Sequence, residues 1–363
     1  MNELEKPCKI YIHKLELPAS KRIQFEKIIR AQTPQSTNDL ALTSQARNEM
    51  IIVIEKSSAE SSIVACEKYL TYLYGLILSV EDNSSLRLNE QLTFSWSSAF
   101  NKNSFHTGYS LRFELVMTLV TFGICHYNRV CEINNETSEV NFDDNAKLMV
   151  NHLKIASGIF EFISQVEISK WMNPPEDRPI ECFSNFSIAL SSLCMSLANL
   201  VSVLKAMKQG TSHLVVSKVA CEAWHKAELS KNQFKDLPGG HFKKLSKSFR
   251  AYIATYISIL YSITMVELSK NSKDEQKYSD ALGYMSLMIP YSKLKKSSDQ
   301  ILQSALDVIM NNLTHEFNSL NKENELIYFT KKTEEKALVK PQAKAFLTST
   351  VYSPPLPAFT SFS

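Results

Sequence analysis

Helix-breaking residues are scarce in this chain, whose 363 residues include only 8 glycines and 12 prolines. No proline occurs between Pro34 and Pro174, and that interval is long enough for several helices. Proteins that bind phosphate through Rossmann or P-loop turns place glycines in those turns, and β-sandwiches use glycine in their hairpins. The scarcity argues against these classes and predicts long α-helices joined by short connections.

The composition narrows the class of protein and its partners. With 40 basic and 37 acidic side chains the formal net charge is +3, whereas a dedicated nucleic-acid binder has a strong positive excess. Hydrophobic residues make up 44% of the chain, enough for a substantial core and too many for a disordered protein. The 7 cysteines are scattered without a CxxC pair, and the first residues contain no apolar signal segment. We therefore expect a cytosolic protein with reduced thiols and no nucleic-acid partner.

Apolar side chains recur with helical periodicity along most of the chain. The ranges that carry this pattern are 20–32, 38–56, 59–81, 109–133, 143–170, 181–208, 211–230, 241–270, 273–289 and 296–322. They follow one another as antiparallel pairs without a strict repeat length, which favours a mostly α solenoid similar to tetratricopeptide folds. No polar break is long enough for a linker, so we expect one domain over 1–363 with a helical core at about 20–322.

A few short β-strands are expected near the two ends of the chain. Residues 8–17 alternate apolar and polar side chains before Pro18. In the C-terminal segment 324–363, residues 326–330 and 337–340 have the character of short extended pieces, and a proline-rich end follows them.

One stretch could be mistaken for a membrane span. Residues 182–204 carry no charge and are as long as a span requires. However, serines and an asparagine recur on one side of the helix, opposite a stripe of phenylalanine and leucine. This polar stripe predicts a helix packed inside a bundle rather than one that faces lipid.

Motifs with a known catalytic or metal-binding mechanism are absent from the sequence. It has no GxGxxG, P-loop, HExxH, GxSxG or EF-hand pattern. Cys221 and His225 share one helix face, but no third ligand lies near them in the sequence, and a core thiol beside a histidine explains the pair. We expect no enzyme activity, metal, cofactor or small-molecule substrate, although catalytic groups that converge from distant helices would leave no such pattern.

Several short stretches, taken in chain order, resemble the BRO-one domain that Alix, rhophilin, the brox proteins and plant endosomal BRO-like proteins share. They are LTYLYGL at 70–76, FSWSS at 94–98, LRFELVM at 111–117, LKIASGIF at 153–160, LVVSKVA at 214–220 and ENELIYF at 323–329. The resemblance implies a curved helical solenoid that acts as an adaptor in endosomal sorting. It also implies a partner, the C-terminal amphipathic helix of an ESCRT-III subunit (a charged multivesicular body protein). Such an adaptor is expected in the cytoplasm, peripherally recruited to endosomes.

Val215 and Val219 are the main candidates for contact with this partner helix. The resemblance places them at the apolar positions that bind the partner, and Leu204 and Met207 are expected to form walls of the same site. On a helical wheel the two valines lie among charged residues, opposite a broad face of small and apolar side chains. This placement predicts that both are exposed; the alternative is that another helix covers them.

Two further candidate sites are a group of basic residues and one tyrosine. Lys243, Lys247 and Arg250 recur along one face of the predicted helix 241–270, which suits either a solvated face or contact with an acidic partner or endosomal membrane surface. Tyr328 matches a tyrosine that is phosphorylated in some relatives.

The alternative function is a signalling scaffold of tetratricopeptide type that binds another protein such as a small GTPase.

Overall fold

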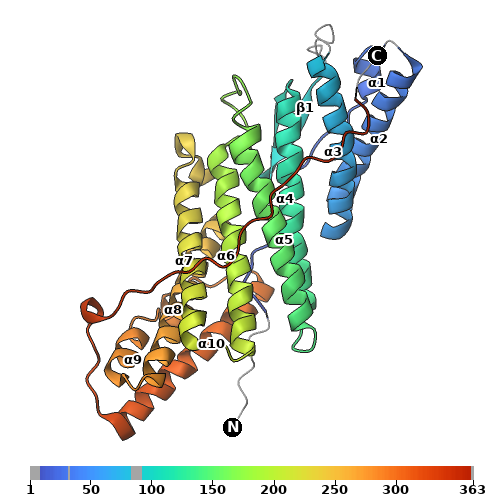
Figure 1. Ribbon diagram of the computed structural model, residues 1–363. Coiled ribbons are helices and arrows are strands. Elements are labelled where there is room, and N and C mark those ends of the chain that lie inside the picture. The colour runs from blue at the N-terminus through green and yellow to red at the C-terminus, as the bar shows by residue number, and fades with distance from the viewer. Residues whose placement is uncertain (1–8, 32, 83–91, 361–363) are drawn as a thin grey trace.

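The computed structural model describes residues 9–31, 33–82 and 92–360, and these are predominantly α-helical (Figure 1). The long helices are α2 (Pro34–Lys56), α3 (Ala59–Asp82), α4 (Leu111–Glu136), α5 (Phe142–Phe162), α6 (Ser184–Lys208), α7 (His213–Lys235), α8 (Lys247–Asp274) and α10 (Gln300–Glu323). Two short helices are α1 (Phe25–Ile28) and α9 (Tyr278–Met285). From α2 to α8 each long helix packs against the next in antiparallel fashion, which confirms the predicted solenoid.

The hydrophobic core runs through the whole row of helices as one continuous cluster. By length and composition α3, α6 and α8 could each cross a membrane, but 89% of the most apolar window of α6 is buried inside the protein. Helix α6 lies between α5 and α7, and its serines hydrogen-bond to neighbouring helices, as when Ser196 Oγ donates to the Ala223 carbonyl at 2.6 Å. The prediction of a helix packed inside a bundle is therefore confirmed.

The N-terminal segment is extended but forms no β-strand over its described residues. Asn134 of α4 accepts from the Ile10 N–H at 2.8 Å and donates to the Ile10 carbonyl at 3.1 Å. Asn128 makes the same pair of bonds with Leu15, at 3.0 and 2.7 Å. Side-chain amides of α4 thus replace a neighbouring strand, so the alternating pattern of residues 9–17 indicated an extended chain correctly and a sheet wrongly (residue 8 lies outside the described part).

The strands lie elsewhere, in a hairpin of β1 (Phe94–Ser98) and β2 (Asn101–Gly108). Ser20 of the N-terminal segment forms an isolated bridge with Trp96 on the other edge of β1. In the described residues these are the only strands, so the expectation of strands near the two chain ends is wrong. The sequence missed the hairpin because most of β2 is exposed and polar, which leaves no alternation to detect.

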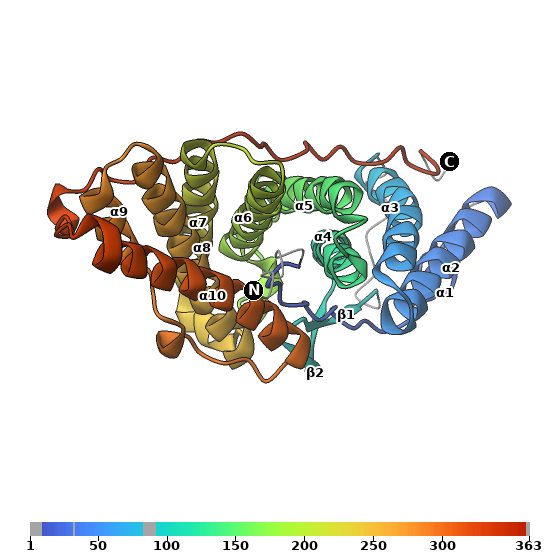
Figure 2. The same ribbon diagram turned by 90° about the horizontal axis from the view of Figure 1, so that it is seen from below.

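The C-terminal residues 329–360, which we call the strap, run across the helices without pairing into a sheet (Figure 2). Four backbone hydrogen bonds fix its path: Thr333 N–H to Ser279, Lys344 N–H to Lys218, Thr350 N–H to Lys154 and Ala358 N–H to Thr71. It therefore passes over α9, α7, α5 and α3 in turn, on the face opposite α10 and the hairpin. Residues 324–328, part of which was expected to be extended, instead form a π-helical turn that continues α10.

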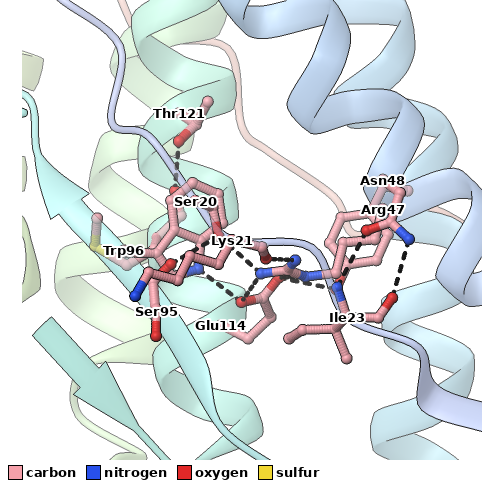
Figure 3. A network of polar contacts seen from close by, with 11 residues as sticks. Ser20, Lys21, Ile23, Arg47, Asn48, Ser95, Trp96, Glu114 and Thr121 are labelled. Carbon is pink, nitrogen blue, oxygen red and sulfur yellow. Dashed lines mark hydrogen bonds and ion pairs between the residues drawn. The ribbon is translucent and has the colours of Figure 1, made fainter. Parts of the chain in front are cut away.

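A buried ion pair connects the first half of the solenoid (Figure 3). The Glu114 carboxylate of α4 accepts from Arg47 Nε of α2 at 2.7 Å and from Trp96 Nε1 of β1 at 2.6 Å. Tyr69 of α3 donates to the same carboxylate at 2.9 Å, and Arg47 also donates to Ser20 Oγ at 2.8 Å. Because both charged side chains are fully buried, the network holds three helices, the hairpin and the N-terminal segment in fixed relative positions.

Candidate functional site

The two valines expected to contact a partner differ in exposure. Val215 is 39% exposed, whereas only 7% of Val219 is exposed. The Lys344 N–H donates to the carbonyl of Lys218, so the strap lies against α7 at the turn that contains Val219. The prediction of exposure is therefore right for Val215 and wrong for Val219, which belongs to the buried core cluster. A helical wheel for one helix does not include the packing of other segments against it.

A groove lies between α5 and α6 on the same face. Its volume is about 340 Å³, and its lining residues are Ala146, Lys147, Val150, Asn151, Lys154, Val201, Ser202 and Lys205. Of its apolar residues, Ala146 and Val201 are buried and Val150 is half-buried, and lysines from both helices lie beside them. A groove with this lining can hold apolar side chains of a partner while it attracts acidic ones.

The groove and Val215 form one surface. The start of α5, the end of α6 and the start of α7 meet at the same end of the antiparallel row. The strap crosses α5 at Lys154, which lines the groove, and crosses α7 at Lys218, one turn after Val215. We call this surface, made by Val150, Lys154, Lys205, Val215 and Lys218, the α5–α7 face; Val201 lines the groove from the buried core.

The α5–α7 face carries unneutralised positive charge. Lys147 pairs with Asp144 at 3.2 Å, and Lys208 pairs with Asp143 at 3.3 Å. In contrast, none of the described acidic side chains forms an ion pair with Lys154, Lys205 or Lys218, all of which are half-buried. A partner segment that brings acidic side chains to these three lysines would gain a favourable electrostatic interaction.

The structure does not place the other two predicted wall residues on this face. Leu204 is 6% exposed and belongs to the core. Met207 is 36% exposed, but it follows the groove residue Lys205 by two positions, and such residues point about 200° apart on a helix. Both were chosen by closeness in sequence to the end of α6, which does not determine the direction of a side chain.

The predicted basic stripe is divided between two elements. Helix α8 begins at Lys247 with Ser246 as its N-cap, and Lys243 belongs to a preceding 3₁₀ turn, Pro238–Lys244, so the predicted helix 241–270 begins too early. Gly239 and Gly240 have positive φ, which ends any helical path there. Lys243 and Lys247 are exposed, and the Arg250 guanidinium lies over the ring of Phe242 at 5.6 Å.

Tyr328 lies in the π-helical turn at the end of α10. Its ring stacks on that of Tyr278, with the centroids 3.7 Å apart. The apolar side chains around it, Leu326, Ile327 and Phe329, are all exposed. The tyrosine is therefore half-buried by one stacked ring and is accessible from the other side.

The Cys221–His225 pair has the contact that its spacing predicts, with the sulfur 3.8 Å from Nε2. Burial raises the pKa of the Cys221 thiol to about 11, so the sulfur is protonated at neutral pH and is a poor nucleophile. Within the described residues no three His, Cys, Asp or Glu side chains gather in a way that could hold a metal ion.

Sequence reasoning missed the lysines of the α5–α7 face. Lys154 of this face and Lys147, which lines the groove beside it, are seven residues apart and therefore share one side of α5, which was a detectable pattern. Lys205 and Lys218 belong to two other helices, and only the fold brings them beside α5.

Comparison with known proteins agrees with this architecture. Residues 16–356 match the sequence model of the BRO1-like domain. A search among curated protein sequences finds no match.

Three solved structures share the fold at low sequence identity. A structure of ALIX in complex with the SIVmac239 PYKEVTEDL late domain has a TM-score of 0.76 at 15% identity; it covers 97% of this chain, which spans 50% of that ALIX chain. An ALIX BRO1–CHMP4C complex has a TM-score of 0.74 at 18% identity and covers 97% of this chain and 99% of its own. A structure described as the basis for endosomal targeting by the Bro1 domain has a TM-score of 0.66 at 16% identity, with coverages of 94% and 93%.

Proposed function

This chain belongs to the BRO1-like domain family, and we propose that it is a non-enzymatic adaptor that binds the C-terminal amphipathic helix of an ESCRT-III subunit during endosomal sorting. The observation that carries the proposal is the α5–α7 face, where a groove with apolar and lysine side chains lies beside the exposed Val215, and three lysines have no acidic partner among the described residues. The similar ALIX BRO1 structure is a complex with CHMP4C, which supports a partner of this class.

An amphipathic helix suits this face for two reasons. Its apolar residues, spaced three or four apart, would enter the groove between α5 and α6 and contact Val215. Acidic residues along its flank would reach Lys154, Lys205 and Lys218. The strap borders the face where it crosses Lys154 and Lys218, and would limit how far the partner helix extends.

The proposal extends to localisation and regulation. The chain would act in the cytoplasm and be peripherally recruited to endosomes, in keeping with a similar structure that concerns endosomal targeting. The exposed Lys243 and Lys247 would add weak contact with an acidic membrane surface. Phosphorylation of Tyr328 would separate its ring from Tyr278, since the added charge favours solvent.

A binding measurement with purified protein tests the main proposal. Labelled peptides with the C-terminal helices of the ESCRT-III subunits are titrated with the full chain, and at least one should bind. Val215→Asp should weaken that binding at least about 100-fold, because an unpaired carboxylate buried against an apolar helix costs several kcal/mol. Val64→Asp provides a matched control, since Val64 is 61% exposed on the distant helix α3.

The lysines have a test of their own. Lys154→Glu combined with Lys205→Glu should reduce the affinity, and raising the ionic strength should weaken the wild type more than this variant. Failure of every ESCRT-III peptide to bind would contradict the proposal and favour the scaffold that binds another class of protein.

A further inference from the structure

Backbone hydrogen bonds join the strap to the helices on either side of residues 351–357 (VYSPPLP). Just before it, the Thr350 N–H donates to the Lys154 carbonyl at 3.0 Å, and just after it, the Ala358 N–H donates to the Thr71 carbonyl at 3.0 Å. Between these anchors no backbone-to-backbone hydrogen bond joins the segment to another described residue. The carbonyl groups of this stretch are therefore free to accept hydrogen bonds from a partner.

Proline fixes the conformation of this stretch. The proline ring fixes φ at about −65°, and this applies to Pro354, Pro355 and Pro357. A residue that precedes proline favours an extended ψ. Ser353, Pro354 and Leu356 all precede a proline, and the described residues contain no cis peptide bond. These constraints favour a polyproline II conformation for residues 353–357.

Aromatic side chains anchor this segment on both sides. Before it, the ring of Tyr352 packs against Phe162 of α5, with centroids 5.1 Å apart. After it, the ring of Phe359 packs against Tyr72 of α3 at 6.5 Å. The segment is thus ordered in the absence of a partner, and binding would not require it to lose the freedom of a flexible chain.

The outer side of the segment is apolar. Leu356 is 88% exposed, and Ser353 and Pro354 are exposed beside it. A spacer that only crosses the helices needs no large apolar side chain in solvent. No charged residue occurs after Lys344, so any recognition here relies on apolar contacts and on the carbonyl groups.

We propose that residues 353–357 are a docking site for a proline-recognition domain, one of the SH3 or WW kind with an aromatic-lined groove. Such domains bind an exposed polyproline II segment between aromatic rings and donate hydrogen bonds to its carbonyls. The site lies on the strap between α5 and α3, beyond the part that borders the α5–α7 face. It is therefore independent of the proposed ESCRT-III contact.

The test is a titration of purified SH3 and WW domains with the full chain, followed by fluorescence or NMR. At least one domain should bind, and the double variant Pro354→Ala/Pro357→Ala should lose at least about tenfold in affinity. Pro341→Ala removes a proline of the same strap outside the segment and should leave the affinity unchanged. If the double variant melts at a lower temperature, Leu356→Glu replaces it, because Leu356 is almost fully exposed and its change should weaken binding without cost to the fold.

Two comparisons show whether the folded strap itself is the ligand. The full chain should bind a domain at least as tightly as the isolated peptide 349–360, because the segment is already ordered. A domain that binds the peptide but not the chain would overturn the proposal, as would failure of every domain to bind. Val215→Asp should leave this binding intact, so loss of the ESCRT-III contact and loss of this contact can be distinguished.

Discussion

The carbonyl oxygen of Thr350 lies so close to Gly158 that a β carbon on this glycine would stand 1.7 Å from it. One turn earlier on α5, the Lys154 carbonyl accepts the Thr350 N–H. The strap therefore rests on α5 at the one position where the helix has no side chain. A glycine inside a helix costs about 1 kcal/mol relative to alanine, and here the close approach of another backbone accounts for its presence.

Gly158→Ala should release the strap from α5. Propensity alone would make this variant more stable, but the added methyl group cannot coexist with the Thr350 carbonyl, which is backbone and cannot rotate away. We expect the free energy of unfolding to fall by about 1–3 kcal/mol and amide exchange to rise in the strap around Thr350.

Asn151→Ala on the exposed side of α5 is the control for a substitution to alanine in this helix, and it should leave exchange in the strap unchanged. A Gly158→Ala variant that melts at or above the wild-type temperature would show that the strap is not seated on α5.

The helices could be predicted from local sequence pattern, whereas the position of the strap could not. The scarcity of glycine and proline was sufficient to predict long helices, since each helix depends on residues a few positions apart. Thr350 contacts Gly158 through backbone atoms, although the two residues are far apart in sequence. A backbone contact of this kind produces no hydrophobic periodicity in the sequence. The same limit hid the pairing of Ile10 with the Asn134 amide.

Glu114→Gln should destabilise the fold strongly. It keeps the shape of the side chain but removes the charge that neutralises Arg47, which has no exposed surface. An uncompensated buried guanidinium typically costs about 3–5 kcal/mol, measured as the change in the free energy of unfolding in urea. The exposed pair Lys68–Glu49 has the same 2.7 Å separation, so Glu49→Gln is the matched control and should cost less than about 1 kcal/mol. Equal effects of the two variants would mean that burial does not govern this network.

Glu181 should make stability depend on pH. Burial raises the pKa of this carboxyl to about 7, although Ser98 Oγ and the Ala99 N–H donate to it. The folded chain therefore keeps a proton that the unfolded chain, with the ordinary pKa of 4.5, has already lost. Stability from this group is greatest below pH 4.5, falls by up to about 3 kcal/mol as the pH rises to about 7, and is constant above that.

The check is the difference between wild type and Glu181→Gln, because other groups titrate in the same range. Glutamine keeps an oxygen for the two donors and carries no charge. The variant should therefore be no more stable than the wild type near pH 4.5, and it should be more stable than the wild type at pH 8. Parallel stability curves for the two proteins between pH 4.5 and 8 would rule out an elevated pKa for Glu181.

The candidate site was only partly predictable from the sequence. Val215 could be identified because its own helix placed it opposite the packed face, and its exposure depends on little else. Val219 lies on the same side of the helix, yet it is buried. The neighbouring Lys218 accepts a hydrogen bond from Lys344, which is more than one hundred residues further along the chain. The lysines of the α5–α7 face belong to three helices, so only the packing of those helices assembles the charge.

The two valines provide a final prediction, since the same substitution to aspartate at these two positions, one turn apart on α7, should give opposite results. At Val219, which is 7% exposed, aspartate would bring a carboxylate into the core and lower the free energy of unfolding by several kcal/mol. At Val215, which is 39% exposed, the carboxylate can stay hydrated, and the change should remain near about 0.5 kcal/mol. Melting temperature and binding of an ESCRT-III peptide, measured on the same preparations, separate the two effects. Val215→Asp should melt like the wild type and fail to bind, whereas Val219→Asp should melt at a lower temperature. A Val219→Asp protein with wild-type stability would mean that Val219 is not part of the packed core in solution.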